Sequence, residues 1–110
     1  DDIYGVGNLE LRAIHTPGHT PGALCLLVEK HLFAGDTLFS GGPGRTGSPD
    51  AFRQIKDSID RKLMGLHKDT VVYTGHGDQT TIGEAQNEIS VFDSKTHSED
   101  LCGNVVWLTS

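Results

Sequence analysis

Three histidines and one aspartate lie in a stretch rich in glycine and proline, from Ala13 to Gly47, between segments with the pattern of β-strands. Proline fixes the backbone on either side of His19 and glycine frees it, so a rigid irregular loop presents this imidazole at the end of a strand. Asp36 follows a second strand pattern in the same stretch. Side chains held by such loops are more often functional than merely packed. The stretch therefore predicts part of a metal site.

Three segments around these loops have the pattern of strands, at residues 8–15, 23–29 and 32–35. The first alternates apolar and polar residues, which is the period of a strand with one buried face. The second is almost continuously apolar, as in a strand covered on both faces. Lys30 and His31 predict a tight turn between the second and third segments. These two segments therefore form a hairpin that delivers Asp36 to its loop.

Two helices are predicted from capping signals and apolar spacing. Ser48, Pro49 and Asp50 follow a glycine-rich loop and have the pattern of a helix start, and the apolar three- and four-residue spacing continues to about Gly65. Thr81 and Glu84 have the spacing of a capping box, which opens a second amphipathic helix. Each helix is expected to bury one face against a sheet.

A fourth strand pattern, residues 70–74, ends abruptly at a loop that carries His76. After Phe92 the sequence is polar and aperiodic, until the run from Val105 to Leu108 predicts one further strand. The chain is therefore divided into a domain at residues 1–92 and a polar tail at residues 93–110.

Three strand ends thus carry His19, Asp36 and His76. With a β-α-β order and parallel strands, these loops meet at one edge of the sheet, where α/β proteins place their sites. Two imidazoles and one carboxylate suit Zn²⁺ or Fe²⁺, and three protein ligands with an open position are typical of catalytic zinc. A metal there lowers the pKa of bound water from about 15.7 to roughly 7. Mn is a further candidate, because these ligands do not distinguish the three metals.

The other histidines are interpreted as structural or surface residues. Pro17 and Gly18 rule out a helix that would pair His15 with His19 as helical metal ligands. His31, His67 and His97 lie in a predicted turn, a helix end and the polar tail. Arg45 either neutralises an anionic substrate or pairs with an acidic neighbour.

Composition excludes several classes of function. The net charge of −6 and the lack of a basic cluster argue against nucleic-acid binding. No apolar run is long enough for a membrane span, and no signal peptide is expected. Cys25 and Cys102 lie far apart in the sequence, which gives a weak case for a disulfide. A reduced, cytoplasmic protein is the expectation.

Three ordered motifs, HTPGHTPG, AGDTLFSGG and YTGHGDQTTIG, resemble the third, fourth and fifth metal-binding motifs of the metallo-β-lactamase-fold hydrolases, particularly the glyoxalase-II-like (hydroxyacylglutathione hydrolase-like) branch. The resemblance implies that His19 binds one metal, that Asp36 bridges two metals and takes part in catalysis, and that His76 binds the second metal. It further implies hydrolysis of a small thioester or ester, with metal-bound hydroxide as the nucleophile.

The His-x-His-x-Asp-His motif, which supplies the remaining ligands in that family, does not occur in this sequence. In the family this motif lies upstream of the first motif matched here. The expected fold is therefore α/β, as the C-terminal half of an αββα sandwich, with a mixed sheet of about five strands and two covering helices. Such a half-site holds at most one metal by itself.

A half-sandwich leaves an apolar sheet face uncovered. A homodimer, a partner chain carrying the N-terminal half, or the rest of a longer parent protein would cover it. Two functions remain open from the sequence. The chain is either a hydrolase, or a fragment of one, whose site is completed by that missing half, or a non-catalytic interaction or oligomerisation module that retains a relic single-metal site.

Overall fold

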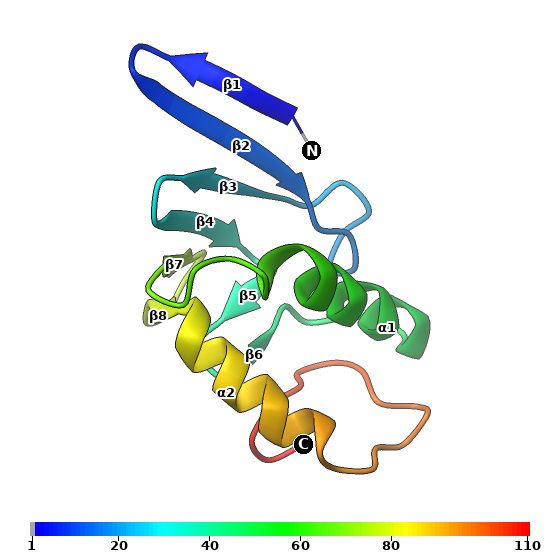
Figure 1. Cartoon of the computed structure of the whole chain (residues 1–110). Helices are drawn as coiled ribbons and strands as arrows, with labels where there is room; N and C mark the ends of the chain where they lie inside the picture. The colour runs from blue at the N-terminus through cyan, green and yellow to red at the C-terminus, as the bar shows by residue number, and fades with distance from the viewer. Residues whose placement is uncertain (1) are drawn as a thin grey trace.

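A computed structural model describes residues 2–110 and has an α/β architecture with a mixed sheet and two helices (Figure 1). The strands are β1 (Asp2–Val6), β2 (Leu9–His15), β3 (Leu24–Val28), β4 (His31–Gly35), β5 (Leu38–Phe39), β6 (Gly42–Pro43), β7 (Val71–Thr74) and β8 (Thr80–Thr81). The helices are α1 (Pro49–Ser58) and α2 (Ile82–Asp93), and a π-helical turn, η1 (Ile59–Leu63), continues α1. The predicted fold class and the two covering helices are confirmed.

The main sheet has six strands in the order β1-β2-β3-β4-β7-β8, and β5 and β6 form a separate two-stranded hairpin. All neighbours in the main sheet are antiparallel except β4 and β7, which run parallel. A parallel pair needs a long crossover, and the segment containing α1 and η1 provides it. The predicted β-α-β unit is therefore present. Parallel pairing is confined to this one pair of strands.

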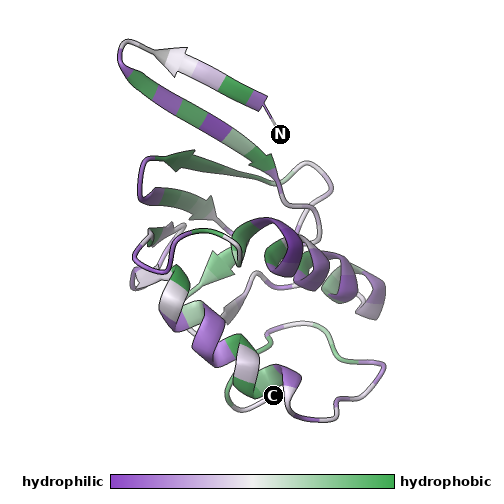
Figure 2. Cartoon of the chain, viewed as in Figure 1, coloured by the Kyte–Doolittle hydropathy of each residue, from purple (hydrophilic) through white to green (hydrophobic). Residues whose placement is uncertain are grey.

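One face of the sheet carries the hydrophobic core. Ile14, Cys25, Leu32 and Val72 are fully buried and belong to the same apolar cluster as the inward residues of both helices. Alternating bands of hydrophobic and hydrophilic residues are visible along β2 in Figure 2, but the alternating apolar residues do not form its buried face, since Leu9 is 46% exposed and only Ile14 in this strand is buried. The two helices therefore cover the same side of the sheet.

The opposite face of the sheet is open. Leu24, Leu26 and Phe33 are 53%, 37% and 47% exposed, and the ring of Tyr73 stacks on Phe33 at a centroid distance of 5.0 Å. The cross-strand register places Leu26 opposite Phe33, and Phe33 opposite Tyr73. The prediction that the strand at residues 23–29 is covered on both faces is wrong, because nothing in the described chain packs over this side.

Both helix starts follow the predicted capping. The Ser48 hydroxyl accepts a hydrogen bond from the Ala51 amide at 3.1 Å, and Pro49 occupies the first turn. The Thr81 hydroxyl accepts from the Glu84 amide at 3.1 Å. The Glu84 carboxylate instead accepts from the Thr80 hydroxyl at 2.9 Å. The second helix thus has a genuine N-cap without the reciprocal half of the box.

Several boundaries differ from the sequence expectations. The turn after β3 consists of Glu29 and Lys30, and His31 already belongs to β4. The strands β1, β5, β6 and β8 were not predicted. The predicted strand at residues 105–108 does not form, and this segment is irregular. Two of its apolar residues pack into the core instead of pairing with a strand, and one of them, Trp107, is fully buried there. No helix among residues 2–110 is long and apolar enough to cross a membrane.

Candidate metal centre

His19 lies in the loop between β2 and β3. Gly18 has φ +145°, and a Cβ at this position would lie 2.3 Å from the Cβ of Ile55 in α1, so only glycine fits. The Ser58 hydroxyl of α1 donates to the Pro17 carbonyl at 2.9 Å. Helix α1 therefore holds the backbone of the loop directly before His19.

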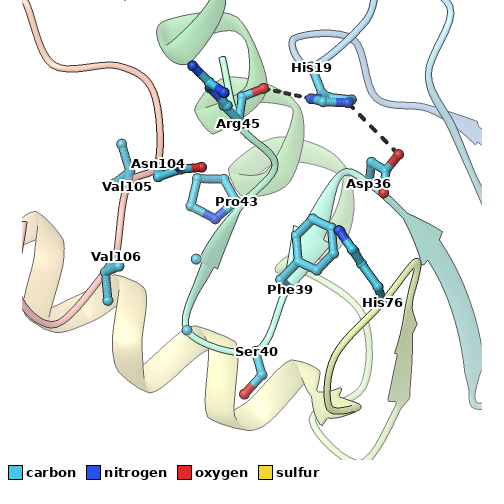
Figure 3. Close-up of a pocket in the computed structure, with 12 residues that line it drawn as sticks. His19, Asp36, Phe39, Ser40, Pro43, Arg45, His76, Asn104, Val105 and Val106 are labelled. Atoms are coloured by element: carbon cyan, nitrogen blue, oxygen red, sulfur yellow. Dashed lines mark hydrogen bonds and ion pairs between the residues drawn. The ribbon is translucent and has the colours of Figure 1, made fainter.

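The orientation of the His19 ring is fixed by one hydrogen bond. Its Nδ1 lies 2.6 Å from the Arg45 carbonyl oxygen. A carbonyl only accepts, so Nδ1 carries the proton, and in the neutral ring Nε2 has a free lone pair. Nε2 lies 3.9 Å from Oδ2 of Asp36 (Figure 3). The Nε2 lone pair of the neutral ring and the Asp36 carboxylate therefore face each other, and no proton is required between them.

Asp36 directly follows β4, at a point where the strand is irregular. The pairing of β4 with β7 shifts between Phe33 and Gly35, which places one extra residue on β4. Gly35 has φ +51°. The bulge and the left-handed glycine turn the chain at the strand end and direct the Asp36 side chain into a cavity.

His76 follows β7, the parallel neighbour of β4, and lines the same cavity of about 500 Å³ as His19 and Asp36. Its ring meets the Phe39 ring edge-on at a centroid distance of 4.9 Å (Figure 3). Among residues 2–110, no three His, Cys, Asp or Glu side chains lie close enough together to hold a metal ion. The structure thus brings the three predicted residues to one cavity but pairs only His19 with Asp36 at close range.

The chemistry of this pair suits a divalent cation. Metal–nitrogen and metal–oxygen bonds of about 2.0–2.2 Å allow two atoms 3.9 Å apart to reach one ion. Metal-binding histidines usually donate their other ring N–H to a carbonyl or carboxylate, as His19 does to Arg45. A Cβ on Gly44 would lie 1.8 Å from the Asp36 carbonyl oxygen. Glycine is therefore needed for the backbone to approach this closely.

The remaining wall of the cavity includes residues that sequence reasoning missed. Phe39, Asn104, Val105 and Val106 line it together with Arg45. The Trp107 amide donates to the Gly41 carbonyl at 2.8 Å, which pins the tail across the glycine-rich loop. The sequence signal that could have indicated this packing of the tail was Trp107, because a large apolar residue in a polar segment is usually buried against another part of the protein.

Thr46 and Gly103 form a second link between the tail and this loop. They exchange two backbone hydrogen bonds, of 3.3 Å and 3.0 Å. Glu88 of α2 is also held near the loop, through a hydrogen bond with the Gly41 backbone. Burial and the neighbouring Glu84 raise the pKa of Glu88 above its ordinary value, and that hydrogen bond partly offsets the shift.

The other histidines lie outside the cavity and have partners of their own. His15 Nε2 is 2.7 Å from the Pro21 carbonyl oxygen, and His31 Nδ1 is 2.9 Å from the Tyr73 hydroxyl. His67 Nδ1 accepts from the Asp69 amide at 3.1 Å. His97 donates to the Phe92 carbonyl and stacks on the Phe92 ring, with centroids 3.8 Å apart.

The family profile described as "Metallo-beta-lactamase superfamily" matches residues 2–76, which include all three candidate ligands. The chain belongs to the metallo-β-lactamase superfamily. The resemblance to this superfamily and to its glyoxalase-II-like branch is confirmed by curated relatives. The chain is 36% identical over 98 residues to "Hydroxyacylglutathione hydrolase GloC" of Haemophilus influenzae, covering 86% of this chain and 46% of that protein. It is 35% identical over 109 residues to "Probable hydroxyacylglutathione hydrolase glo2" of Schizosaccharomyces pombe, covering 94% of this chain and 41% of that protein.

Solved structures of the metallo-β-lactamase superfamily share the fold. The BLEG-1 B3 metallo-β-lactamase matches with a TM-score of 0.70 and 33% identity, over 79% of this chain and 43% of that one. TTHA1623, solved "in a di-iron-bound form", matches with a TM-score of 0.61 and 31% identity, over 76% of this chain and 42% of that one. The chain spans less than half the length of each of these four relatives.

Proposed function

We propose that this chain supplies one half of a metal-dependent hydrolytic site, with His19, Asp36 and His76 as its metal ligands. The observation that carries the proposal is the geometry of the His19–Asp36 pair. The His19 Nδ1 proton is committed to the Arg45 carbonyl, and Nε2 faces the Asp36 carboxylate at 3.9 Å within a cavity that His76 also lines. Zinc is the first candidate, with iron or manganese as alternatives, and the chain alone holds one ion.

A divalent ion bound there would supply Lewis acidity, which activates water and polarises the carbonyl of a substrate. The side chains of this chain would orient the substrate. Arg45 offers a positive charge at the cavity edge, and Phe39, Pro43 and Val106 offer an apolar surface. A thioester or ester with a small acyl group and an anionic part fits this combination. The names of the two glyoxalase-II-like relatives support a thioester such as an acylglutathione.

Completion of the site requires a second half, and the open face of the sheet is where it would dock. Leu24, Leu26 and Phe33 lie exposed there beside Tyr73. The relatives, of which this chain covers only 46% and 41%, support either a longer parent protein or a partner chain with the N-terminal half. A homodimer through this face is the alternative. Light scattering of the isolated chain tests self-association, since a mass of 11.8 kDa would contradict the dimer.

A second candidate function is a non-catalytic interaction module with a relic metal site. It is favoured by the position of His76, which packs against Phe39 and completes no group of three metal-binding side chains among residues 2–110. Under this alternative the pairing of His19 with Asp36 has only a structural role. Both candidates are compatible with a reduced, cytoplasmic setting, which the free thiols of Cys25 and Cys102 support.

Elemental analysis and metal titration of the purified chain distinguish the two candidates. The metal-site proposal predicts about one equivalent of Zn, Fe or Mn per chain, and loss of most of it in His19→Ala and in Asp36→Asn. His67→Ala is the matched control, because His67 is exposed and lies outside the cavity. Less than about one tenth of an equivalent in the unmodified chain, unchanged by His19→Ala, would favour the relic. Hydrolysis of an acylglutathione, with and without an added N-terminal half, tests the reaction itself.

A further inference from the structure

Two buried threonine hydroxyls lie directly behind the candidate metal ligands. Thr16 and Thr37 are 0% and 1% exposed, and their Oγ1 atoms lie 3.0 Å apart. Thr16 belongs to the loop that carries His19, and Thr37 directly follows Asp36. This hydrogen bond is therefore a side-chain link between the two loops that present the metal ligands.

Backbone hydrogen bonds extend the link to the ligands themselves. The Thr16 amide donates to the Ala23 carbonyl at 2.8 Å, which closes the base of the His19 loop. The Thr37 carbonyl accepts from the Gly44 amide at 2.9 Å. Gly44 precedes Arg45, whose carbonyl orients the His19 ring. Thr37 is thus connected to Asp36, which precedes it in the chain, and through Gly44 and Arg45 to His19.

The hydroxyl pair continues into a short chain of hydrogen bonds that ends in the sheet. Thr16 Oγ1 lies 3.5 Å from Cys25 Sγ, and this thiol donates to the Ala34 carbonyl at 3.8 Å. Because the thiol donates to Ala34, the Thr16 hydroxyl donates to Cys25 and the Thr37 hydroxyl donates to Thr16, so each of the three groups uses its one proton in this network. Burial raises the pKa of the Cys25 thiol, so this donor keeps its proton. A satisfied buried network of this kind fixes relative positions more sharply than apolar packing does.

We propose that the Thr16–Thr37 hydrogen bond is a positioning element that sets the distance between His19 Nε2 and Asp36 Oδ2. The inference rests on the proposed metal-binding function and names the residues that pre-organise its ligands. Neither threonine lines the cavity, so both act through the backbone of the loops. Such supporting contacts typically change metal affinity by about 10–100-fold when they are removed.

Valine has the shape of threonine without the hydroxyl, which allows positioning to be separated from folding. Thr16→Val leaves the Thr37 hydroxyl without its partner, and Thr37→Val leaves the Thr16 hydroxyl with only its long contact to Cys25 Sγ, so each single variant should lower the unfolding midpoint of the metal-free protein. The double variant removes both hydroxyls and should recover much of that midpoint, because a matched apolar pair leaves nothing unsatisfied. Its affinity for Co²⁺ should still fall about 10-fold or more, with a changed visible absorption spectrum of the bound Co²⁺.

Two control variants complete the experiment. Thr37→Ser keeps the hydroxyl and should bind Co²⁺ within about twofold of the unmodified chain. Thr81→Val removes a threonine hydrogen bond at the start of α2, outside the cavity, and should lower the unfolding midpoint without weakening Co²⁺ binding. A double-valine variant that binds Co²⁺ with unchanged affinity and spectrum would overturn the positioning role alone. Failure of the unmodified chain to bind Co²⁺ would instead overturn the proposed function on which it rests.

Discussion

Gly75 lies so close to Asp36 that a side chain at position 75 would occupy the space of the carboxylate. A Cβ there would be 2.6 Å from Asp36 Oδ1 and 3.1 Å from the Gly35 carbonyl oxygen. The Gly75 amide also donates to that carbonyl at 2.7 Å. The ends of the parallel strands β4 and β7 therefore pack too closely to admit a side chain at position 75, and Asp36, a candidate metal ligand, lies at this contact.

Gly75→Ala should consequently displace the Asp36 carboxylate. We expect metal affinity to fall about 10-fold and the free energy of unfolding to fall by about 1–3 kcal/mol, because the added methyl meets backbone as well as carboxylate. Metal titration and urea denaturation measure the two effects. Gly65→Ala is the control, since a Cβ at Gly65 would meet nothing within 4 Å. Equal metal affinity in both variants would contradict this role for Gly75.

Trp107 should anchor the tail to the domain. It is fully buried and packs edge-on against Phe92 at a centroid distance of 5.2 Å. Trp107→Ala should lower the free energy of unfolding by about 3–5 kcal/mol, as for other large buried aromatic residues. Circular dichroism during urea denaturation measures this loss. Leu108→Ala, at an adjacent residue that is 48% exposed, should cost less than about 1 kcal/mol. Similar losses in the two variants would show that the tail is not anchored through Trp107.

Lys56 should contribute to stability in a pH-dependent manner. Its ammonium lies 2.9 Å from Asp93 Oδ1 of α2 and also pairs with Asp60 of η1. Burial lowers the pKa of Lys56, but the two carboxylates outweigh this and raise it above its ordinary value of 10.5. The folded state thus binds this proton more tightly than the unfolded state does. The resulting stability is fully present below pH 10.5 and is lost as the pH rises through the higher folded pKa.

Lys56→Met should therefore cost about 1 kcal/mol near neutral pH, where the ion pairs are intact. The difference between the variant and the unmodified chain should shrink as the pH approaches about 11. Urea denaturation at about pH 8 and about pH 11 gives both values. Lys30→Met, in the exposed turn before β4, corrects for the general effect of losing a lysine. A difference that is constant with pH would contradict the proton linkage.

The two cysteines should differ in reactivity. Cys25 is fully buried with a raised thiol pKa, whereas Cys102 is partly exposed. Because the thiolate is the reactive form, a thiol reagent should label one cysteine per folded chain and two after denaturation. Mass spectrometry of the labelled peptides should assign the fast site to Cys102. Rapid labelling of Cys25 in the folded chain would show that the network behind the proposed metal ligands is open to solvent.

Local signals in the sequence predicted the local structure well. Ser48 and Thr81 both accept the helix-capping hydrogen bonds expected of them, since a cap depends only on residues within one turn. The alternation that ends at His15 predicted the strand itself but not its buried face, because Leu9 is 46% exposed and the buried residue of this strand is Ile14. The assignment of Asp36 to a strand end likewise needed only the short apolar run before it.

Features that depend on distant contacts were not predictable. β1 forms by pairing with β2, and Gly5 interrupts any alternation in its own sequence. The apolar run of β3 does not reveal that Leu24 points to an open face, because sequence shows hydrophobicity and not what covers it. Trp107 and Val105 reach the core only because the tail folds back over Gly41. The side-chain position of His76, beside Phe39, is set by the same kind of tertiary contact.

The crossover between β4 and β7 also determines when the site can exist during folding. Asp36 and His76 end neighbouring strands, but the whole helical segment between them must fold back before those strands can pair. Pairing across such a long loop is slow compared with the closing of the hairpin formed by β3 and β4. His19 and Asp36 can therefore approach each other early, whereas His76 joins them only after the crossover has closed. Binding of a metal ion by His19, Asp36 and His76 together would then indicate that the domain has folded completely.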